Sequence, residues 1–313
     1  MFEPLCAALD AAGIACTRNE LLADHCTFRI GGPADIFIKP CDEIQLCRAV
    51  AFCKEQGARY YLLGNGSNIL FEDAGFRGAV LDLTAMKTGI GMKENIPGEE
   101  SGVVYCNVTV GAGMKFSTLC NFALNHSCTG LEFAYGIPGT VGGAIYMNAG
   151  AYGGEMKDIL KSVTVLTADG QEKELTPGEL DMSYRHSSIT EEHYMVLGVT
   201  IALEAGSQEQ IRAKMEELKE KRVEKQPLEY PSAGSTFKRP EGYFAGKLIM
   251  DAGLRGFQVG GAAVSEKHCG FVINKEKATA SDVYRLIQEV QQEVYRQFGV
   301  KLETEVKMVG DFR

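Results

Sequence analysis

The sequence predicts a protein that contains both helices and strands and has two or three domains. Its 313 residues exceed one small module, because domains commonly hold roughly 100–200 residues. Hydrophobic residues make up 45% and charged residues 23%, an ordinary globular composition that can form sizeable cores. Segments with helical periodicity alternate along the chain with short apolar strands. The 36 glycines gather in a few segments between these elements, and these segments are the most informative about function.

Charge and hydropathy exclude several classes of protein. Lys and Arg number 32 against 41 Asp and Glu, and this net charge of −9 disfavours a general nucleic-acid binder. No apolar stretch approaches the roughly 20 residues of a membrane span, and residues 1–17 lack the basic start of a secretory signal. The ten cysteines include no CxxC pair, so no zinc knuckle is predicted. We therefore expect a cytoplasmic protein with reduced cysteines.

The first third of the chain is predicted to surround one glycine-rich loop with strands. The expected elements are a turn at 29–35, a strand at 36–38, a helix from Asp42 to about Gln56, and strands at 60–63 and near 79–83. The loop at 64–68 lies between the last two strands. Its residue types suit a backbone nest that holds a diphosphate, but they equally suit a tight turn between strands.

The middle third is predicted to contain an exposed polar loop, two helices and a hairpin. The expected elements are the loop at 93–101, a strand at 103–110, a helix at 115–125, a hairpin of 163–166 with 172–176, and a helix at 207–225. Ser207 and Gln210 resemble a capping box for the last helix. Its charged face, with Lys219, Lys221, Arg222 and Lys225, is predicted to be solvated.

The last third begins at a predicted domain boundary near Lys225. Residues 231–238 are expected to form a turn. Thr279 and Asp282 predict the capped start of an amphipathic helix that ends at Gly299. Residues 300–309 alternate as a strand does.

Glycine-rich segments at 136–144 and 148–154 form the densest such region of the chain. So many small residues imply a backbone packed against something bulky and flat. Neither the dinucleotide fingerprint GxGxxG leading into a helix nor the phosphate loop GxxxxGK[ST] occurs. A bound dinucleotide would therefore require another fold.

Seven segments, in order, resemble the UDP-N-acetylenolpyruvoylglucosamine reductase family of bacterial cell-wall precursor enzymes. They are RIGGPAD at 29–35, LGNGSNIL at 63–70, YGIPGTVGGAIYMNAGAYG at 135–153, SYRHSSI at 183–189, PSAGSTFKRP at 231–240, AGKLIMDAGLRGFQVGGAAVSEKHCGFVIN at 245–274, and LETEVKMVG at 302–310. Together they span nearly the whole chain. The first three match the family's FAD-binding half.

The resemblance implies an α+β fold in which a two-subdomain FAD-binding module of the vanillyl-alcohol-oxidase type precedes a C-terminal α+β substrate-binding domain. It places subdomain 1 at 1–85 with a C-terminal strand at 303–313, subdomain 2 at 86–225, and the substrate-binding domain at 226–302. The chain lacks an inserted tyrosine loop and so resembles the shorter, second type. Cys26 stands where the family commonly has Asn or Thr, which affects one local hydrogen bond.

The resemblance also implies a reaction. NADPH reduces noncovalently bound FAD, and the flavin then passes hydride to UDP-N-acetylglucosamine enolpyruvate, giving UDP-N-acetylmuramate. The negative charge that develops on the substrate carboxylate needs preorganised donors, and the α-carbon needs a proton. By family match, Ser235 is the proton donor, Arg185 binds the developing charge, and Glu305 assists. Glu303 lies two residues away on the same predicted strand face, and only the family pattern selects Glu305.

The remaining candidate residues also follow from the matched motifs. Those expected to contact FAD are Arg29, Gly64, Asn65, Gly66, Ser67, Asn68, Gly136, Ile137, Pro138, Gly139, Val141, Gly142, Gly143, Ala144, Asn148, Ala149 and Gly150. Those expected to bind substrate are Tyr184, Lys247, Gln258 and Lys238. The five histidines have no metal-ligand spacing, so no catalytic metal is predicted. No obligate protein partner is predicted.

Two alternatives stay open on the sequence. Another FAD oxidase or dehydrogenase of the same fold would keep the glycine segments but would not need Arg185, Ser235 and Glu305 together. A flavin-binding scaffold that has lost its chemistry would bind FAD without turnover.

Overall fold

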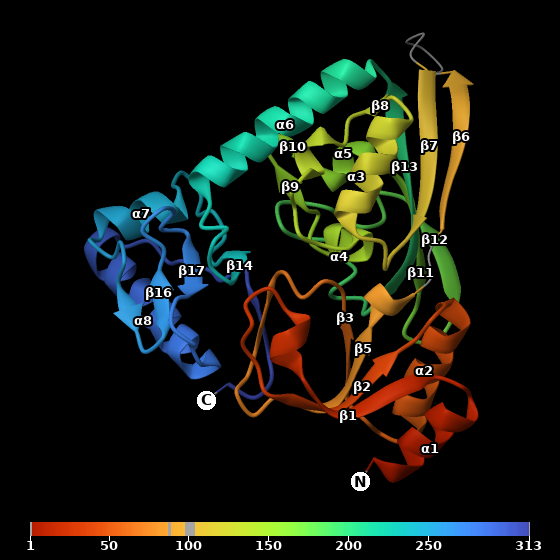
Figure 1. Ribbon diagram of the computed structural model, residues 1–313, viewed down its shortest axis with the longest axis horizontal. Helices are drawn as coiled ribbons and strands as arrows, with labels where there is room; N and C mark the ends of the chain where they lie inside the picture. The colour runs from red at the N-terminus through yellow and green to blue at the C-terminus, as the bar shows by residue number, and fades with distance from the viewer. Residues whose placement is uncertain (1, 87–88, 98–103, 313) are drawn as a thin grey trace. The chain divides into compact units, whose positions relative to one another are not determined.

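The computed structural model describes residues 2–86, 89–97 and 104–312 (Figure 1). By its internal packing the chain divides into two compact units. Unit 1 consists of Met1–Ile38, Ala51–Leu81 and Val223–Arg313, and unit 2 consists of Lys39–Val50 and Asp82–Arg222. Each unit is thus assembled from segments that are distant in the sequence. The predicted division into three domains stays a prediction.

The N-terminal part of unit 1 is built around a four-stranded sheet, and α1 lies beside β1 (Figure 1). In spatial order the strands are β1 (Ala15–Leu21), β2 (Pro33–Lys39), β5 (Phe76–Asp82) and β3 (Tyr60–Leu63). Helix α1 (Glu3–Ala11) and a 3-10 turn at Leu22–His25 complete this region. Helix α2 (Glu43–Glu55) belongs partly to each unit, because unit 2 includes Lys39–Val50 and unit 1 resumes at Ala51. The Gln45 N–H donates to Asp42 at 2.8 Å, so α2 begins where Asp42 predicts.

The C-terminal part of unit 1 is an antiparallel sheet with two helices. In spatial order its strands are β14 (Ser232–Ser235), β17 (Phe271–Asn274), β16 (Ala262–Val264) and β15 (Gln258–Val259). The helices are α7 (Ala245–Asp251) and α8 (Ala280–Phe298). Strand β18 (Lys307–Val309) returns to pair in parallel with β4 (Ile69–Phe71). One cluster of buried side chains, with Phe71 and Leu286 among its members, includes residues of both parts.

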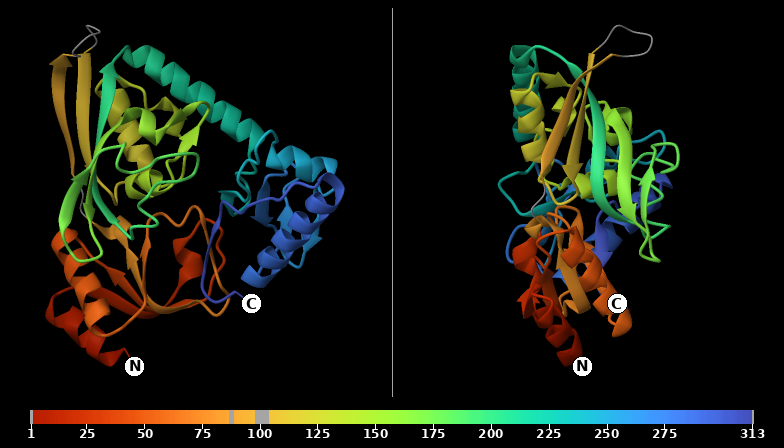
Figure 2. Two further views of the ribbon diagram at one scale, coloured as in Figure 1. Left: turned by 180° about the vertical axis from the view of Figure 1, so that it is seen from behind. Right: turned by 90° about the vertical axis from the view of Figure 1, so that its right-hand side faces the viewer.

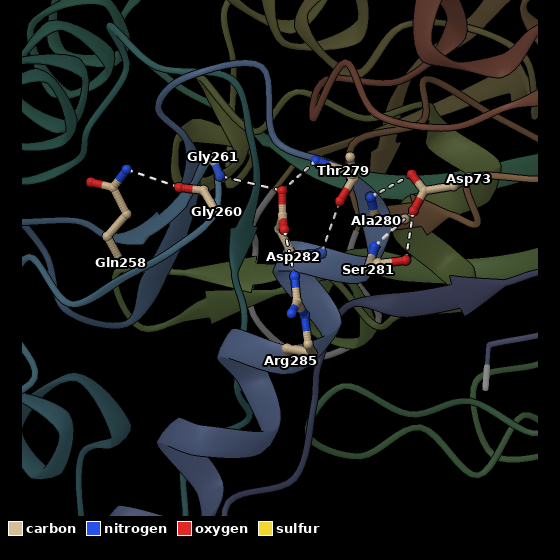
Figure 3. Close-up of polar contacts among 9 residues, drawn as sticks. All are labelled: Asp73, Gln258, Gly260, Gly261, Thr279, Ala280, Ser281, Asp282 and Arg285. Atoms are coloured by element: carbon tan, nitrogen blue, oxygen red, sulfur yellow. Dashed lines mark hydrogen bonds and ion pairs between the residues drawn. The ribbon is translucent and has the colours of Figure 1, made fainter.

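Helix α8 begins and ends as the sequence predicts. Thr279 Oγ1 accepts from the Asp282 N–H at 3.0 Å, and Asp282 Oδ2 accepts from the Thr279 N–H at 3.1 Å, which completes the capping box (Figure 3). The helix ends at Gly299, whose φ of 68° is left-handed. The predicted apolar stripe, Val283, Leu286, Ile287, Val290 and Val294, is buried.

A carboxylate from the loop after β4 holds the first turn of α8. The Ala280 N–H donates to Asp73 Oδ1 at 2.7 Å, and the N–H and hydroxyl of Ser281 donate to Asp73 Oδ2 at 2.9 and 2.8 Å (Figure 3). These amides have no acceptor within the helix, and a negative charge is favourable at this terminus. Asp73 therefore ties the loop that follows β4 to the C-terminal helix, 207 residues away.

We expect Asp73→Ala to lower the free energy of unfolding by about 1–2 kcal/mol, the usual cost of losing an N-terminal cap. Urea denaturation followed by circular dichroism measures this loss. Ser281→Ala is the matched control, because it removes only the hydroxyl bond and should cost less. A free energy of unfolding for Asp73→Ala equal to that of the wild type would contradict the assigned role of this carboxylate.

His268 makes the stability of unit 1 depend on pH. Its Nδ1 accepts from the Gly270 N–H at 3.1 Å, and its ring meets Phe271 edge-on at 5.0 Å between centroids. Burial lowers the pKa of His268 below its ordinary value of 6.5. Between the folded pKa and about 6.5 the unfolded chain binds more protons, so stability rises with pH in that window.

Accordingly, the free energy of unfolding should fall as the pH is lowered below about 6.5, and this loss should be absent above it. Urea midpoints measured between pH 5 and 8, a span that brackets the ordinary histidine pKa, test this expectation. His268→Gln should show a flatter slope below pH 6.5 than the wild type. Identical slopes for the two proteins would count against His268 as the source.

Unit 2 is a six-stranded sheet with helices packed on it. Its main path is β12 (Glu172–Leu175), β11 (Leu160–Leu166), β13 (Met195–Ala205), β7 (Val104–Gly111) and β6 (Ile90–Pro97), with β8 (Cys128–Thr129) beside β13. The helices are α3 (Phe116–Asn125), α4 (Val141–Tyr146), α5 (Met156–Ile159) and α6 (Gln208–Lys225). Short elements are 3-10 turns at Leu83–Ala85 and Glu132–Ala134 and a hairpin of β9 (Gly150–Ala151) with β10 (Gly154–Glu155). Helices α3 and α6 lie on the same side of the sheet (Figure 2).

Three predictions about local structure were wrong at least in part. Residues 93–97, predicted as an exposed loop, belong to β6, because β7 offers a backbone partner to this polar segment; residues 98–101 lie outside the described residues. Residues 231–238 were predicted as a turn, yet 232–235 form β14. Within 300–309, only 307–309 form a named strand.

The predicted solvated face of α6 also needs correction. Ile211, Met215 and Leu218 are the buried apolar residues of the helix, but Arg222 is buried as well and is 9% exposed. The Ser207 hydroxyl accepts from the Gln210 N–H at 3.5 Å, which agrees with the predicted helix start. All ten cysteines are free thiols. None of the described helices combines the length and apolar character needed to cross a membrane.

Candidate active site

The glycine-rich loop at 64–68 joins β3 to β4 in unit 1. Gly66 has a φ of 58°, and a Cβ placed on it would lie 2.2 Å from the His25 carbonyl oxygen, so only glycine fits there. The Gly66 carbonyl accepts from the Thr27 N–H at 3.0 Å, and the Asn68 carbonyl accepts from the Lys307 N–H at 3.0 Å. The loop is therefore held from both sides by its own unit.

This loop has the donors that a phosphate group needs. The Gly66 carbonyl and the Ser67 N–H belong to the same planar trans peptide group and therefore point in opposite directions. Because the Gly66 carbonyl points toward the Thr27 N–H, the Ser67 N–H points away from Thr27. Ser67 is half-buried, and its hydroxyl is a further donor. A backbone N–H and a hydroxyl on one half-exposed loop suit an anion such as a diphosphate.

Cys26 and Arg29 lie in the turn that packs beside Gly66. Cys26, the departure from the family pattern, is buried, and its thiol donates to the Ile30 carbonyl at 3.3 Å. Burial raises the pKa of this thiol. Arg29 is exposed and has a left-handed φ of 55° between buried Phe28 and Ile30. The turn thereby presents a cation to solvent.

Ser235 ends strand β14, where it pairs with Phe271. Gly234 precedes it with a φ of 75°, and the register of β14 with β17 shifts between Ser232 and Ser235. The next residue, Thr236, is buried; its N–H donates to the Gly270 carbonyl at 2.8 Å and its hydroxyl accepts from the Val272 N–H at 3.0 Å. These bonds on its C-terminal neighbour hold the backbone position of Ser235.

Glu305 lies on the segment that runs alongside Ser235. The Glu305 N–H donates to the Thr236 carbonyl at 2.8 Å, and the Asn68 side-chain amide donates to the Glu305 carbonyl at 3.2 Å. Unit 1 thus brings together the backbones of a predicted proton donor, its predicted assistant and the loop at 64–68. Asn68, predicted only as a cofactor contact, also tethers the segment that carries Glu305.

The side chains of Glu303 and Glu305 differ in exposure, although the predicted strand would place both on the same face. Their segment is not a regular strand, because only Thr304 forms an isolated bridge, with Phe237. The Glu303 side chain is 76% exposed and forms an ion pair of 3.4 Å with Lys238, whereas Glu305 is half-buried. The structure therefore separates two carboxylates that alternation alone could not.

The glycine block of unit 2 begins at a turn against Arg222. Gly136 has a φ of 87°, and a Cβ there would lie 3.0 Å from Arg222 Nε. The guanidinium also stands over the Tyr152 ring, with Cζ 5.6 Å from the centroid. Burial lowers the pKa of Arg222, although arginine stays charged at ordinary pH. Sequence reasoning missed this contact because helical periodicity does not show what covers a polar position.

Two glycines of this block, Gly142 and Gly150, are required by the protein's own packing, whereas the sequence suggests a bulky, flat partner. A Cβ on Gly142 would lie 2.8 Å from Ala112 Cβ, and one on Gly150 would lie 2.7 Å from the Gly154 carbonyl oxygen. Thr140 caps α4 by accepting from the Gly143 N–H at 3.3 Å. The protein's own packing accounts for these glycines. The other predicted FAD contacts of the block, Ile137, Pro138, Gly139, Val141, Ala144 and Ala149, lie in or next to this turn and helix.

Arg185 occupies a tight turn in unit 2. Ser183 and His186 exchange backbone hydrogen bonds of 3.1 Å each, and Arg185 between them has a left-handed φ of 57°. Its Nη2 donates to the Gly150 carbonyl at 3.1 Å, and its guanidinium lies 5.0 Å from the centre of the Tyr184 ring. A strained arginine held by a close turn is typical of a functional position.

Asn148 joins this turn to the glycine block. It is fully buried; its side-chain amide donates to the Ser183 carbonyl at 3.0 Å and to Glu155 at 2.9 Å, and its oxygen accepts from the Lys157 N–H at 3.0 Å. Unit 2 thus brings Arg185 and Tyr184 next to predicted FAD-contacting residues, as unit 1 does for Ser235 and Glu305.

The remaining substrate candidates are exposed residues. Lys247 forms an ion pair of 2.7 Å with Asp251 on α7. Gln258, on β15, donates to the Gly260 carbonyl at 2.9 Å and accepts from Lys275 at 3.3 Å. Tyr184 is 49% exposed. In the described part of the chain, no three His, Cys, Asp or Glu side chains cluster as ligands of a metal ion.

Comparisons with known proteins agree with this arrangement. A model described as an FAD binding domain matches residues 34–176, and one described as the UDP-N-acetylenolpyruvoylglucosamine reductase C-terminal domain matches residues 226–309. UDP-N-acetylenolpyruvoylglucosamine reductase from Agathobacter rectalis is 53% identical over 296 residues, which cover 94% of each chain. This chain belongs to the UDP-N-acetylenolpyruvoylglucosamine reductase family.

Other members of the UDP-N-acetylenolpyruvoylglucosamine reductase family give the same picture. The reductase from Lachnoclostridium phytofermentans is 52% identical over 94% of this chain and 93% of its own length. The crystal structure of the Thermus caldophilus reductase has a TM-score of 0.75 and 32% identity, and covers 95% of this chain and 99% of that one. The predicted fold class and the prediction of a flavin-dependent oxidoreductase are confirmed.

Proposed function

We propose that this enzyme reduces UDP-N-acetylglucosamine enolpyruvate to UDP-N-acetylmuramate for peptidoglycan precursor synthesis in the cytoplasm. NADPH is the hydride donor, and noncovalent FAD carries the hydride from donor to substrate. Membership of the reductase family supports the substrate, and the match to an FAD binding domain supports the cofactor.

The observation that carries this proposal is the pairing of the segments that bear Ser235 and Glu305. The 2.8 Å bond from the Glu305 N–H to the Thr236 carbonyl joins the backbone segments that carry the two residues, and further backbone bonds hold both segments. An FAD oxidase that does not protonate its substrate has no need of these two groups together. A fixed backbone also provides the preorganisation that catalysis requires.

Each candidate catalytic or substrate-binding residue has a defined task in this proposal. Ser235 gives a proton to the substrate α-carbon after hydride reaches the β-carbon. The permanent charge and donor fork of Arg185 stabilise the enediolate-like charge on the substrate carboxylate. Glu305 assists the proton transfer. Tyr184, Lys238, Lys247 and Gln258 contribute to substrate binding.

The predicted cofactor contacts form two groups in the same proposal. Arg29 and the residues from Gly64 to Asn68 interact with phosphate groups of FAD. The residues from Gly136 to Gly150 named above are the second group of proposed FAD contacts. The donors found on the loop at 64–68 fit this role, since phosphate oxygens accept hydrogen bonds from backbone N–H groups and hydroxyls.

An anaerobic visible spectrum of the purified protein tests the proposal in one cuvette. We expect an oxidised flavin band that bleaches with NADPH and returns only when UDP-N-acetylglucosamine enolpyruvate is added. Parallel addition of NADH measures the donor preference. A flavin that bleaches but is not reoxidised by the enolpyruvyl sugar overturns the substrate assignment, and the absence of a flavin band after reconstitution with FAD overturns the cofactor assignment.

A further inference from the structure

Two cysteines outside the candidate active site lie together near the N-terminus of unit 1. Cys6 is on α1 and Cys16 is on β1, and these two elements pack against each other. Cys16 lies two residues before Arg18, on the same face of β1, and Arg18 contacts the Cys6 thiol. Both residues are partly exposed. Neither belongs to a motif that the reductase activity uses.

A cation from β1 completes this cluster. Arg18 Nε donates to Cys6 Sγ at 3.3 Å, and Arg18 Nη1 forms an ion pair of 2.7 Å with Glu3. Glu3 therefore fixes the guanidinium while its Nε faces the sulfur. The positive charge stands beside the atom on which negative charge gathers when Cys6 attacks an electrophile.

We propose that Cys6 and Cys16 are an oxidisable dithiol, in which a hydroperoxide oxidises Cys6 and Cys16 then closes a disulfide between α1 and β1. In the first step the Cys6 sulfur attacks the peroxide O–O bond, giving a sulfenic acid and one water when the oxidant is hydrogen peroxide. In the second step the Cys16 sulfur attacks the Cys6 sulfur and a second water leaves. The two thiols lose two electrons and two protons, and the peroxide is reduced to water.

The roles of the two thiols differ because their surroundings differ. Burial, with a further contribution from Cys6, raises the pKa of Cys16, which disfavours this thiol as the first nucleophile. Cys6 alone has the bond from Arg18. Cys6 is therefore the attacking residue and Cys16 the resolving residue.

Other cysteines of the chain provide internal comparisons. Cys41 is also partly exposed, but its thiol lies 3.6 Å from the Asp42 carboxylate, which repels a developing negative charge. Burial raises the pKa of Cys53 to about 11 and that of Cys120 to about 12. Low exposure and unfavourable charge both slow oxidation of a thiol.

The test exposes the full chain to increasing hydrogen peroxide, blocks the remaining thiols by alkylation, and maps the peptides by mass spectrometry. We expect a peptide pair joined by Cys6 and Cys16 to appear before Cys41 is oxidised, and dithiothreitol to reverse it. In Cys16→Ser, dimedone should trap a sulfenic acid on Cys6. In Cys6→Ser, Cys16 should stay reduced at the same peroxide dose.

Variants of Arg18 test the part played by charge. Arg18→Gln should slow formation of the disulfide about two- to fivefold, the range expected for one exposed charge interaction, and Arg18→Lys should retain most of the rate. The proposal is overturned if Cys41 is oxidised as fast as Cys6, or if Cys6 sulfenic acid accumulates in the wild type without joining Cys16. An equal rate in Arg18→Gln and the wild type overturns the role of Arg18.

Discussion

Ser235→Ala will leave reduction of the flavin by NADPH close to the wild-type rate and will slow reoxidation of the flavin by the enolpyruvyl sugar by about 100- to 10,000-fold. This range is the usual contribution of a positioned general acid. The backbone at Ser235 is set by the bonds of its neighbour Thr236, so the alanine variant should fold normally. Anaerobic stopped-flow spectroscopy measures the two half-reactions separately.

Ser232→Ala is the matched control, since it removes a hydroxyl from the same strand three residues earlier. It should leave both half-reactions unchanged, because the Ser232 contact with Thr27 uses a backbone carbonyl. If Ser235→Ala slows the two half-reactions equally, Ser235 positions the cofactor and another group supplies the proton.

Arg185→Asn should lower the turnover number by about 100- to 1,000-fold, the cost of removing one preorganised donor from a developing negative charge. Asparagine is chosen because it tolerates the left-handed φ of 57° found at this position, so the turn can persist. Arg185→Lys should recover part of the turnover through its charge, although it lacks the planar donor fork. Steady-state kinetics measure both variants.

His186→Gln is the control for Arg185, because His186 lies in the same turn and its ring lies near two exposed acids, Glu191 at 3.7 Å and Asp181 at 4.0 Å. We expect near wild-type turnover for it. Loss of bound flavin or of folding stability in Arg185→Asn, in proportion to the lost turnover, would show that Arg185 acts by holding the turn against Gly150 and not through its charge.

Elements with local signals could be predicted from the sequence. Thr279, Asp282 and Gly299 give α8 its boundaries through bonds within a few residues of each end. The Asp169–Gly170 turn likewise predicts the hairpin of β11 and β12. Such signals depend on nearest neighbours along the chain, which the sequence displays directly.

Elements that depend on distant partners could not be predicted in the same way. Strand β6 has a polar sequence and exists because β7 offers it a backbone edge. Along residues 303–309, successive parts of the backbone bond to Thr236, to Asn68 and to β4. The alternation of the sequence predicts one continuous strand, but the structure has a regular strand only at the end of this segment. The burial of Arg222 depends on Gly136 and Tyr152, 86 and 70 residues away in the sequence.

In the candidate site, too, the sequence shows the local motifs but not the contacts between distant segments. Motif matches identify Ser235, Arg185 and Glu305, but they do not show that the Glu305 segment is hydrogen-bonded to Thr236 and to Asn68. Nor do they show that Asn148 is the link between the arginine turn and the glycine block. These contacts are set by tertiary structure, and they hold in place the backbone segments that carry the candidate residues.

The parallel pairing of β4 with β18 also orders events during synthesis on the ribosome. Residues 69–71 emerge early, yet Phe71 and Leu70, which have no exposed surface in the folded protein, receive their strand partner only after residue 309 has been added. Unit 2 ends at Arg222 and can form its core while the ribosome is still adding Val223–Arg313, the last segment of unit 1. The segments that carry Ser235 and Glu305 are therefore the last to acquire their native contacts.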